Sequence, residues 1–441
     1  MTGPAEAQRS VRLYRLLAAY WMLVLVEWSI WFTVMLAAYE IGGPEAAGIS
    51  AGLTQLPAIF LGPVAAAASD RIPRSRILPF MFLATGAVSA ALALLLYSGA
   101  PLPTVVVAAS MLTLCVAVVR PLHYSSLPAL TANAKSLSWA NSVSGLGFSL
   151  SAFLGPILAG LATVADGLWA VAAGAFVLML VGGALCVHLP LPSMTNDGES
   201  IPSPIRQTIN GLRLLRADRP LLVLVCLSGL GPLALATLEI IGITWAAEVL
   251  GDDAAGQGLV AGAPGFGAML GAVLGAALAY RRRLAPVLVA ALLAGGLMLL
   301  PLMGVSVLVA ALIALAFFGL WERISRLATE RLMQRSASSA TLIEMFAVIE
   351  SVYLIAYLVG SIGSPFIVLA IGPSKAYLVV GLVIIVVAAL SLRVLRDLDR
   401  RALALEPPLP PVTTPHRVGW HGHRHGGGAH WVLHRRLRRP D

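Results

Sequence analysis

The chain has 441 residues, of which 58% are hydrophobic and only 12% are charged, and its formal net charge is +9. Because soluble domains carry about 25% charged residues, this composition excludes a soluble globular protein and indicates a polytopic membrane protein. The basic excess does not indicate nucleic-acid binding, because the arginines of a membrane protein gather in the loops on one side. Three cysteines fall inside apolar runs without paired spacing, and we interpret them as packing residues.

Apolar runs long enough to cross a membrane recur along the chain. A membrane-spanning helix needs about 20 such residues. We therefore predict an all-α polytopic membrane protein with about twelve transmembrane helices. Their centres are Val26, Ile59, Ala87, Met111, Phe153, Phe176, Leu230, Met269, Leu292, Ala314, Leu354 and Ile384.

The charged residues between these runs predict the topology. Basic residues gather in every second gap, whereas the alternate gaps hold acids and a single base, Lys375. The positive-inside rule therefore places both termini in the cytoplasm. The excess of arginine over lysine favours a bacterial plasma membrane. The basic gaps include Arg9, Arg12, Arg15, Arg71, Arg74, Arg76, Lys135, Arg213, Arg216, Arg219, Arg281, Arg282, Arg283, Arg331 and Arg335.

One long gap divides the chain into two sets of six spans. Residues 189–219 begin with a proline-rich, polar stretch and then become helical and basic, which predicts a cytoplasmic linker with a surface helix. Residues 1–188 and 220–395 then form the two six-helix halves. Residues 396–441 form a cytoplasmic tail, which we expect to be disordered beyond residue 406.

The gap between spans two and three reads Asp70-Arg71-Ile72-Pro73-Arg74-Ser75-Arg76, and Arg281-Arg282-Arg283 takes the equivalent place in the second half. The first segment resembles the signature loop of the major facilitator superfamily, with Ala66, Pro73 and Ser75 departing from the family pattern. The resemblance implies the major facilitator fold, with two pseudo-symmetric six-helix halves. It also implies a gating motif of Asp70, Arg71, Arg74 and Arg76. We expect Asp70 to contact the electropositive start of span eleven and to latch the cytoplasmic side shut.

Span five carries Gly155, Pro156 and Gly160, whose spacing resembles the glycine–proline motif of exporters in this superfamily. Small residues let two helices approach closely, and a proline bends a helix. The resemblance implies a pliable seam that favours export. The alternative is plain helix packing.

Two segments of the second half are similar to bacterial efflux-type facilitators. They are Gly256–Gly271 in span eight and Phe346–Gly363 in span eleven. The latter is similar to an actinobacterial subgroup whose members often carry a C-terminal cyclic-nucleotide-binding domain. Leu405–Val412 resembles the lead-in to that domain, but the chain then ends before such a domain could form. We therefore expect no bound nucleotide.

A proton-driven transporter needs an ionisable group in its cavity whose proton affinity changes with access. Glu27 in span one, Glu239 in span seven and Glu350 in span eleven lie deep inside apolar runs, where acids are costly and seldom face lipid. They are candidates for proton coupling. The alternative is that each acid only orients a neighbouring helix. The resemblance adds Arg120 in span four. Its place just before Pro121, near the cytoplasmic end of the span, favours instead an arginine that snorkels to the cytoplasmic surface.

Aromatic residues beside these acids offer a surface for a substrate. Trp28 and Trp31 lie beside the acid of span one, and Tyr353 and Tyr357 share a helical face with the acid of span eleven. Aromatic rings beside an acid suit a lipophilic, drug-like compound, including a cationic one. The alternative is that these residues serve as interface anchors and packing.

Other polar groups receive no catalytic or metal-binding role. Glu322 and Arg323, at the inner end of span ten, are assigned a structural role at the cytoplasmic surface. His421, His423 and His425 alternate in the tail without a cysteine or acid nearby, so we expect no metal site. No phosphate-binding loop or catalytic constellation occurs, and we expect neither a cofactor nor an enzymatic activity.

Together these features predict a secondary active transporter that exports a small amphipathic or drug-like compound by alternating access and proton antiport. Its expected partners are the lipid bilayer, the substrate and protons, without nucleic acid, and we expect a monomer. Two alternatives remain open. One is an importer of a small metabolite, and the other is a non-transporting membrane sensor or scaffold.

Overall fold

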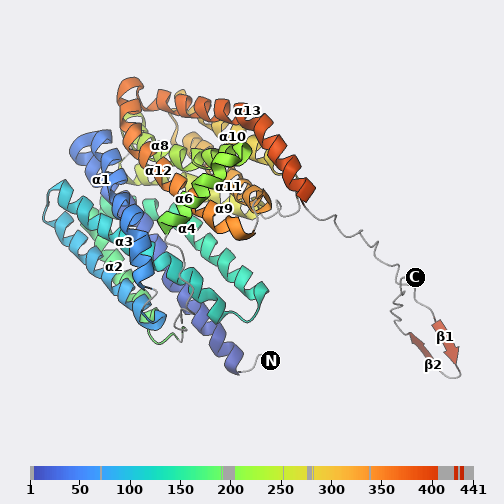
Figure 1. Cartoon of the computed structure of the whole chain (residues 1–441). Coiled ribbons are helices and arrows are strands. Elements are labelled where there is room, and N and C mark those ends of the chain that lie inside the picture. The colour runs from blue at the N-terminus through green and yellow to red at the C-terminus, as the bar shows by residue number, and fades with distance from the viewer. Residues whose placement is uncertain are drawn as a thin grey trace. The chain divides into compact units, whose positions relative to one another are not determined.

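The computed structural model describes most of the chain and separates it into two compact units, residues 1–403 and 404–441. The helices of the first unit fall into two groups, with the blue and cyan helices on one side and the green to red helices on the other (Figure 1). The residues that the structure describes are 4–69, 72–189, 191, 204–251, 253–275, 281, 283–336, 339–405, 422–425 and 428–431.

Long helices build almost all of the described chain. The helices of the first half are α1 (Pro4–Ser69), α2 (Arg74–Tyr97), α3 (Leu102–Leu130), α4 (Ala134–Asp166) and α5 (Leu168–Cys186). The linker and second half contain α6 (Pro204–Ala217), α7 (Arg219–Ser228), α8 (Leu230–Trp245) with a π-helical turn (Ala246–Leu250), α9 (Ala254–Gly275), α10 (Ala285–Leu299) with a 3₁₀ turn (Leu300–Met303), α11 (Leu308–Ser336), α12 (Ser339–Ile371) and α13 (Pro373–Leu405).

The helix α1 contains the first two predicted spans. Among the described residues, eleven stretches are long and apolar enough to cross a membrane, and the first of them has 55 residues. Such a stretch is more than twice the length that one crossing needs. Gly42 and Gly43 interrupt its helical dihedral angles, and the positive φ of 62° at Gly43 suits a glycine. Divided at this kink, α1 supplies two crossings, and the prediction of twelve spans is confirmed.

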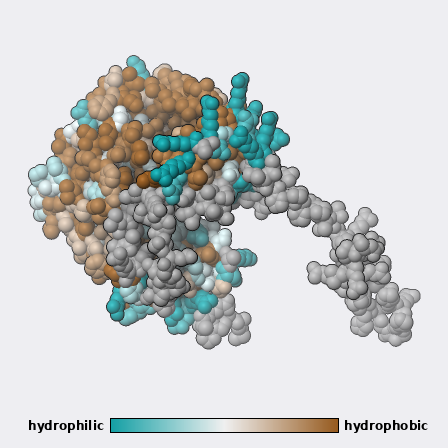
Figure 2. Space-filling model, viewed as in Figure 1, coloured by the Kyte–Doolittle hydropathy of each residue, from teal (hydrophilic) through white to brown (hydrophobic). Residues whose placement is uncertain are grey.

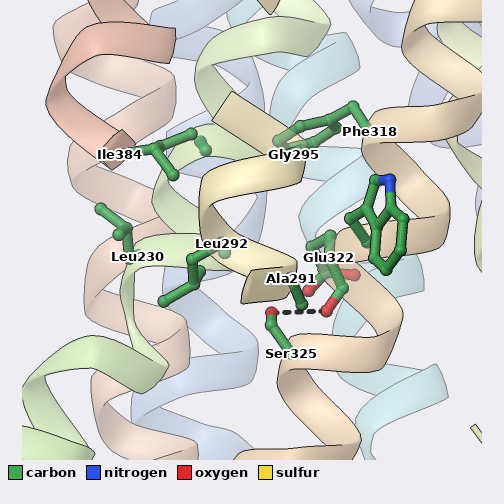
Figure 3. A pocket seen from close by; sticks show the side chains of 11 residues that line it. Leu230, Ala291, Leu292, Gly295, Phe318, Glu322, Ser325 and Ile384 are labelled. Carbon is green, nitrogen blue, oxygen red and sulfur yellow. Dashed lines mark hydrogen bonds between the residues drawn. The ribbon is translucent and has the colours of Figure 1, made fainter. Parts of the chain in front are cut away.

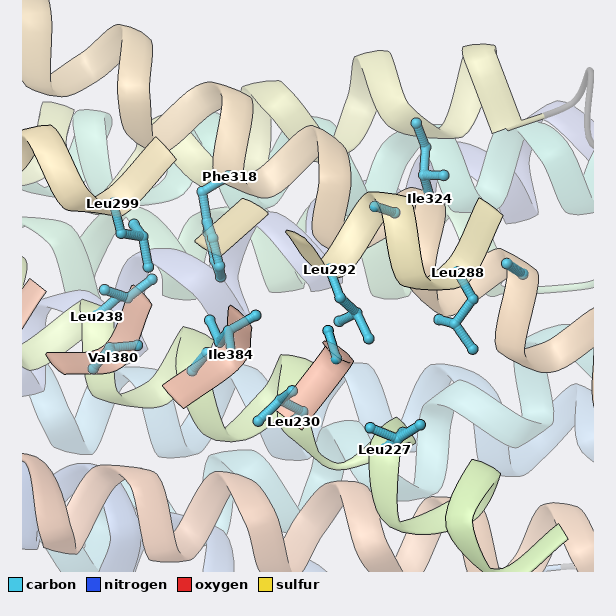
Figure 4. Close-up of a cluster of buried hydrophobic side chains, with 14 of the residues drawn as sticks. Leu227, Leu230, Leu238, Leu288, Leu292, Leu299, Phe318, Ile324, Val380 and Ile384 are labelled. Atoms are coloured by element: carbon cyan, nitrogen blue, oxygen red, sulfur yellow. The ribbon is translucent and has the colours of Figure 1, made fainter. Parts of the chain in front are cut away.

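Each half has its own apolar core, while large apolar side chains also cover the outside. Figure 4 shows the core of the second half, where Leu230, Leu292, Phe318 and Ile384 come together from four helices. A separate cluster, from α1 to α5, fills the first half. Hydrophobic residues cover most of the visible face of the helices in Figure 2, as a lipid-facing surface requires.

Polar side chains tie the helix ends together on the side where α1 begins and α13 ends, which we call the terminal side. Arg15 of α1 donates from Nε to the Leu185 carbonyl at 3.0 Å, at the end of α5. Asp399 of α13 is 4% exposed and accepts the Leu284 N–H at 3.1 Å, at the start of α10. An acid at a helix start and a base at a helix end both complement the helix dipole.

On the side away from the termini, the helices of the two halves pack so closely that their backbones are in contact. A Cβ atom placed on Gly258 of α9 would lie 2.5 Å from the Pro156 carbonyl oxygen of α4, and Gly160 of α4 packs in the same way on Ala254 of α9. Gly48, soon after the kink in α1, would likewise place a Cβ 2.5 Å from Pro365 and from the carbonyl oxygen of Ser361 in α12. Small residues make such close helix crossings possible.

The second unit contains the only strands among the described residues. β1 (Gly422–His425) and β2 (Gly428–Trp431) pair antiparallel, with Gly422 opposite Trp431. The predicted disorder of the tail mainly concerns residues outside the described part of the chain, and it stays a prediction. The same holds for the exact boundaries of the two halves and of the linker.

Candidate functional site

A cavity of about 290 Å³ lies between the two halves. Helices of both halves line it: α1, α3 and α4 from the first, and α8, α9, α11 and α12 from the second. The four proton-coupling candidates and the four aromatic candidates predicted from the sequence all line this one cavity. They are Glu27, Trp28, Trp31, Arg120, Glu239, Glu350, Tyr353 and Tyr357.

In the first half, Glu27 of α1 and Arg120 of α3 form an ion pair. The Arg120 Nη2 atom donates to both carboxylate oxygens, at 2.7 and 2.9 Å. The guanidinium carbon lies 5.4 Å from the centre of the Phe148 ring, on α4. The pair is part-buried, with 40% of the arginine side chain and 23% of the glutamate side chain exposed. Charge pairing and the aromatic ring together lower the cost of holding an arginine at this depth.

The interpretation of Arg120 as a snorkelling arginine is therefore wrong. Pro121 directly after it suggested the end of the span, but α3 continues through Pro121 and Pro128 to Leu130. Arg120 consequently lies nearly three turns inside the helix, at about 5.4 Å per turn. At that depth the Arg120 side chain pairs with an acid in the cavity and does not extend to the membrane surface.

A buried brace lies one turn beyond Arg120. His123 is 1% exposed, its ring stacks on Tyr20 of α1 at 3.9 Å, and its Nε2 atom lies 2.9 Å from Ser144 Oγ of α4. The histidine thus joins three helices of the first half beside the Glu27–Arg120 pair. Sequence reasoning missed this brace, because none of its contacts is local in the chain.

In the second half, Glu239 of α8 occupies a different environment. Glu239 is 6% exposed, and the Tyr357 hydroxyl of α12 donates a hydrogen bond to its Oε2 atom at 2.8 Å. None of the salt bridges found among the described residues includes Glu239. The two helices pack closely here, since a Cβ on Gly360 would lie 2.5 Å from the Leu233 carbonyl oxygen.

Charged side chains of α11 also line the cavity, which the sequence did not predict. Glu322, Arg323 and Arg326 belong to the lining, so the assignment of the first two to the cytoplasmic surface is wrong. The helix α11 runs on to Ser336. Fourteen further residues at 1.5 Å each place Glu322 about 20 Å from that end. The run of charged residues there looked like a helix end, whereas it is the polar face of a longer helix.

Arg326 repeats the arrangement of Arg120. Its guanidinium carbon lies 4.6 Å from the centre of the Tyr353 ring on α12, and its Nε donates to Glu330 at 3.2 Å. In both halves, then, an arginine of the fourth helix crossing stacks on an aromatic ring of the fifth and pairs with a glutamate. This matches the internal symmetry of transporter folds.

The residue Glu322 also borders a second, small cavity inside the second half. This space of about 10 Å³ is roughly that of one water molecule. Apolar residues of α8, α10, α11 and α13 surround it, and Ser325 Oγ donates to the Glu322 carbonyl at 2.7 Å (Figure 3). A Cβ on Gly231 would lie 2.9 Å from Glu322 Oε1, so the glycine leaves room for the carboxylate.

The gating motif is only partly described. Asp70 and Arg71 lie outside the described residues, so the contact of Asp70 with span eleven stays a prediction. Arg74 is 7% exposed and donates from Nη1 to the Ser125 carbonyl at 2.7 Å, which joins α2 to α3. Arg76 is exposed.

The small residues of the span-five motif face two different helices. Gly155 packs on α1, where its Cβ would lie 2.6 Å from the Trp28 Cβ atom, whereas Pro156 and Gly160 pack on α9. The motif therefore contributes both to the first half and to the contact between the halves. No group of three or more metal-ligating side chains is found among the described residues, and His421 lies outside them.

Comparisons with known proteins agree with this architecture. A bacterial homologue of the human lysosomal transporter Spinster, in an inward-facing and unoccupied conformation, has a TM-score of 0.62 at 14% identity, covering 92% of this chain and 99% of its own. The peptide transporter POT, in complex with sulfate, has a TM-score of 0.66 at 14% identity, covering 88% and 95%. At these identities the likeness shows the fold alone. No curated protein is significantly similar in sequence. The sequence profile of the Major Facilitator Superfamily matches residues 16–322, and the chain therefore belongs to that superfamily.

Proposed function

We propose that this protein is a proton-coupled exporter of a small amphipathic compound, working by alternating access. Membership of the superfamily supports secondary transport by a carrier that is not an enzyme. The cavity between the halves supports a binding site that each half can expose in turn. The observation that carries the coupling is the Glu27–Arg120 ion pair inside this cavity.

The proposed orientation places both termini in the cytoplasm of a bacterium, as the arginine distribution favours. The backbone contacts between the halves lie on the side away from the termini. On the cavity wall, Glu350 lies about three turns from the start of α12 and is exposed, whereas Glu239 is 6% exposed. The cavity then opens to the cytoplasm and is closed outside, which is the state that loads a compound for export.

Coupling follows from the electrostatics of the pair. An ionised Glu27 compensates the charge of Arg120 in a region where water is scarce. Proton uptake by Glu27 neutralises the carboxylate and removes the attraction that holds α1 to α3 at this point. A proton taken from outside and a substrate released there would thereby exchange through the same conformational change.

The direction of export rests on the span-five resemblance. Pro156 and Gly160 form part of the contact with α9, so the motif lies where the two halves separate during alternation. We further propose that the protein acts as a monomer and belongs to the actinobacterial efflux-type subgroup. Import of a metabolite and a sensor role are outcomes that the following experiment distinguishes.

The test is transport by purified protein in proteoliposomes with an imposed pH gradient, across a panel of lipophilic compounds. We expect transport of the compound against the proton flow, and loss of the response to the gradient in Glu27→Gln with substrate counterflow retained. Asp397→Asn is the matched control, because Asp397 is 63% exposed in a surface pair with Arg400. Counterflow without any response to the gradient would eliminate proton coupling, transport in the direction of the proton flow would favour import, and absence of all transport would favour a sensor.

A further inference from the structure

The charges that line the cavity do not balance locally. Arg120 pairs with Glu27, Arg326 pairs with Glu330, and Arg323 interacts electrostatically with Glu322. Each cavity arginine therefore has an acid beside it. Among the described residues Glu239 belongs to no salt bridge, and the group that donates a hydrogen bond to it, the Tyr357 hydroxyl, is neutral.

An ionised carboxylate in this position is energetically unfavourable without a counter-charge. Removing an ion from water costs several kcal/mol unless a counter-charge replaces the lost hydration. A tyrosine hydroxyl replaces one hydrogen bond but supplies no positive charge. Glu239 nonetheless lines the cavity, so one face of the site is accessible to a ligand. The missing component of the site is a positive charge.

The surroundings restrict the kind of cation that fits. Trp31 and Tyr357 line the cavity with Glu239, and the Trp28 ring lies 5.5 Å from that of Trp31. Aromatic rings beside a carboxylate attract organic cations, which lose less hydration energy than a metal ion does. One carboxylate is also too few oxygen ligands for a divalent cation. The volume of about 290 Å³ is just below the lower limit of the range for pockets that hold drug-sized ligands, roughly 300–1,000 Å³.

We propose that Glu239 binds the positive group of a monovalent organic cation, with Trp31 and Tyr357 contacting its apolar body, so that the substrate is a cationic amphipath. This rests on the proposed transport function and adds the chemical class of the substrate. A proton and a cation neutralise the same carboxylate, so each excludes the other. The deep position of Glu239, beside the closed contact between the halves, places the cation where alternation would release it outside.

The experiment measures equilibrium binding to purified wild-type protein in lipid nanodiscs. Tetraphenylphosphonium is the probe, and tetraphenylborate, which has the same shape and the opposite charge, is its counterpart. Empty nanodiscs correct for partition into lipid. We expect saturable binding of the cation alone, and weaker binding as the pH is lowered, because protons compete for Glu239.

The decisive variant is Glu239→Gln, which keeps an oxygen to accept the Tyr357 hydrogen bond and so preserves the local fold. We expect its affinity for tetraphenylphosphonium to fall about tenfold or more, as for loss of one buried charge contact. Glu45→Gln is the matched control, because it makes the same substitution at an exposed acid that does not belong to the cavity lining. We expect it to change the affinity less than about threefold.

Three results would overturn the proposal: unchanged binding in Glu239→Gln, equal losses in the two variants, or equal binding of the cation and the borate. The outcome is separable from that of the proposed function. Cation binding that depends on Glu239, without transport driven by a pH gradient, would reject the transport function and leave the site intact. Gradient-driven transport of neutral compounds that Glu239→Gln does not alter would reject the cation site and support the transport function.

Discussion

Arg120 on α3 and Arg326 on α11 repeat one arrangement in the two halves of the molecule. Each guanidinium lies over an aromatic ring of the next helix, at 5.4 Å for the first and 4.6 Å for the second. Each also pairs with a glutamate, but Glu27 belongs to a different helix whereas Glu330 lies one turn further along α11. A proton on the first acid therefore changes a contact between helices, and a proton on the second does not. This difference favours the first half as the one that couples proton binding to the conformational change.

Replacing Arg120 tests whether transport needs the arginine itself or only a positive charge at this position. We expect Arg120→Gln to abolish transport driven by a pH gradient, because Glu27 loses its counter-charge. Arg120→Lys keeps the charge but loses the planar group that stacks on Phe148, and we expect it to retain partial transport. Initial rates in proteoliposomes provide the measurement. Equal rates in wild type and Arg120→Gln would contradict the role of the pair.

Replacing Tyr353 tests the stacking in the second half. Tyr353→Leu removes the ring beneath Arg326, and the loss of a part-buried cation–π contact should lower the free energy of unfolding by about 0.5–2 kcal/mol. Tyr353→Phe keeps the ring and serves as the control. Chemical unfolding in detergent micelles compares the two variants. If both lost the same stability, the hydroxyl and not the ring would be responsible.

Replacing Gly258 tests the contact between the halves. A valine there would collide with the backbone of α4 at Pro156, which cannot move aside as a flexible side chain can. We expect Gly258→Val to abolish transport and to separate the halves on the side away from the termini. Gly174→Val is the matched control, because no atom lies within 4 Å of a Cβ placed there.

The separation is measurable as a distance between spin labels on that side. Exposed Ser98 and Ser306 lie in loops of the first and second half, and Ser98→Cys with Ser306→Cys supplies the label sites once the native cysteines are replaced. The distance should lengthen in the Gly258 variant and stay unchanged in the Gly174 variant. An unchanged distance in both would show that α4 and α9 accommodate the extra volume without opening.

Replacing His123 tests the brace beside the ion pair. His123→Ala leaves a void between Tyr20 and Ser144 and should lower the free energy of unfolding by about 2–4 kcal/mol. Ser144→Ala removes only one hydrogen bond and should cost about 1 kcal/mol. Thermal unfolding of the purified variants measures this order. Equal losses in the two variants would show that the hydrogen bond, and not ring stacking, holds the three helices.

Replacing Asp70 tests the gating motif. We expect Asp70→Asn to abolish transport while membrane insertion stays intact, because the amide cannot supply the charge that complements the start of span eleven. Quantitative immunodetection of the membrane fraction controls for insertion. Full transport by a well-inserted Asp70→Asn protein would contradict the latch.

Much of the architecture could be predicted from the sequence, and the site only in part. The membrane spans, the candidate acids and their aromatic neighbours followed from local patterns. Phe148, Arg326 and the Tyr20–His123–Ser144 brace did not, because single residues in apolar helices carry no mark of their partners. Glu322 and Arg323 were misplaced for a related reason, since a charged stretch marks a helix end or a polar cavity wall equally well.

The sequence by itself determined the number of spans, because the length and hydropathy needed to cross a membrane are properties of one segment at a time. Only the tertiary structure decided which charges meet. Glu27 and Arg120 are 93 positions apart in the chain, and Glu239 and Tyr357 are 118 apart. Hydropathy depends on each residue alone, whereas an ion pair depends on how two helices are rotated against each other. That rotation gives Glu27 an arginine, and leaves Glu239 with a tyrosine and an open cavity.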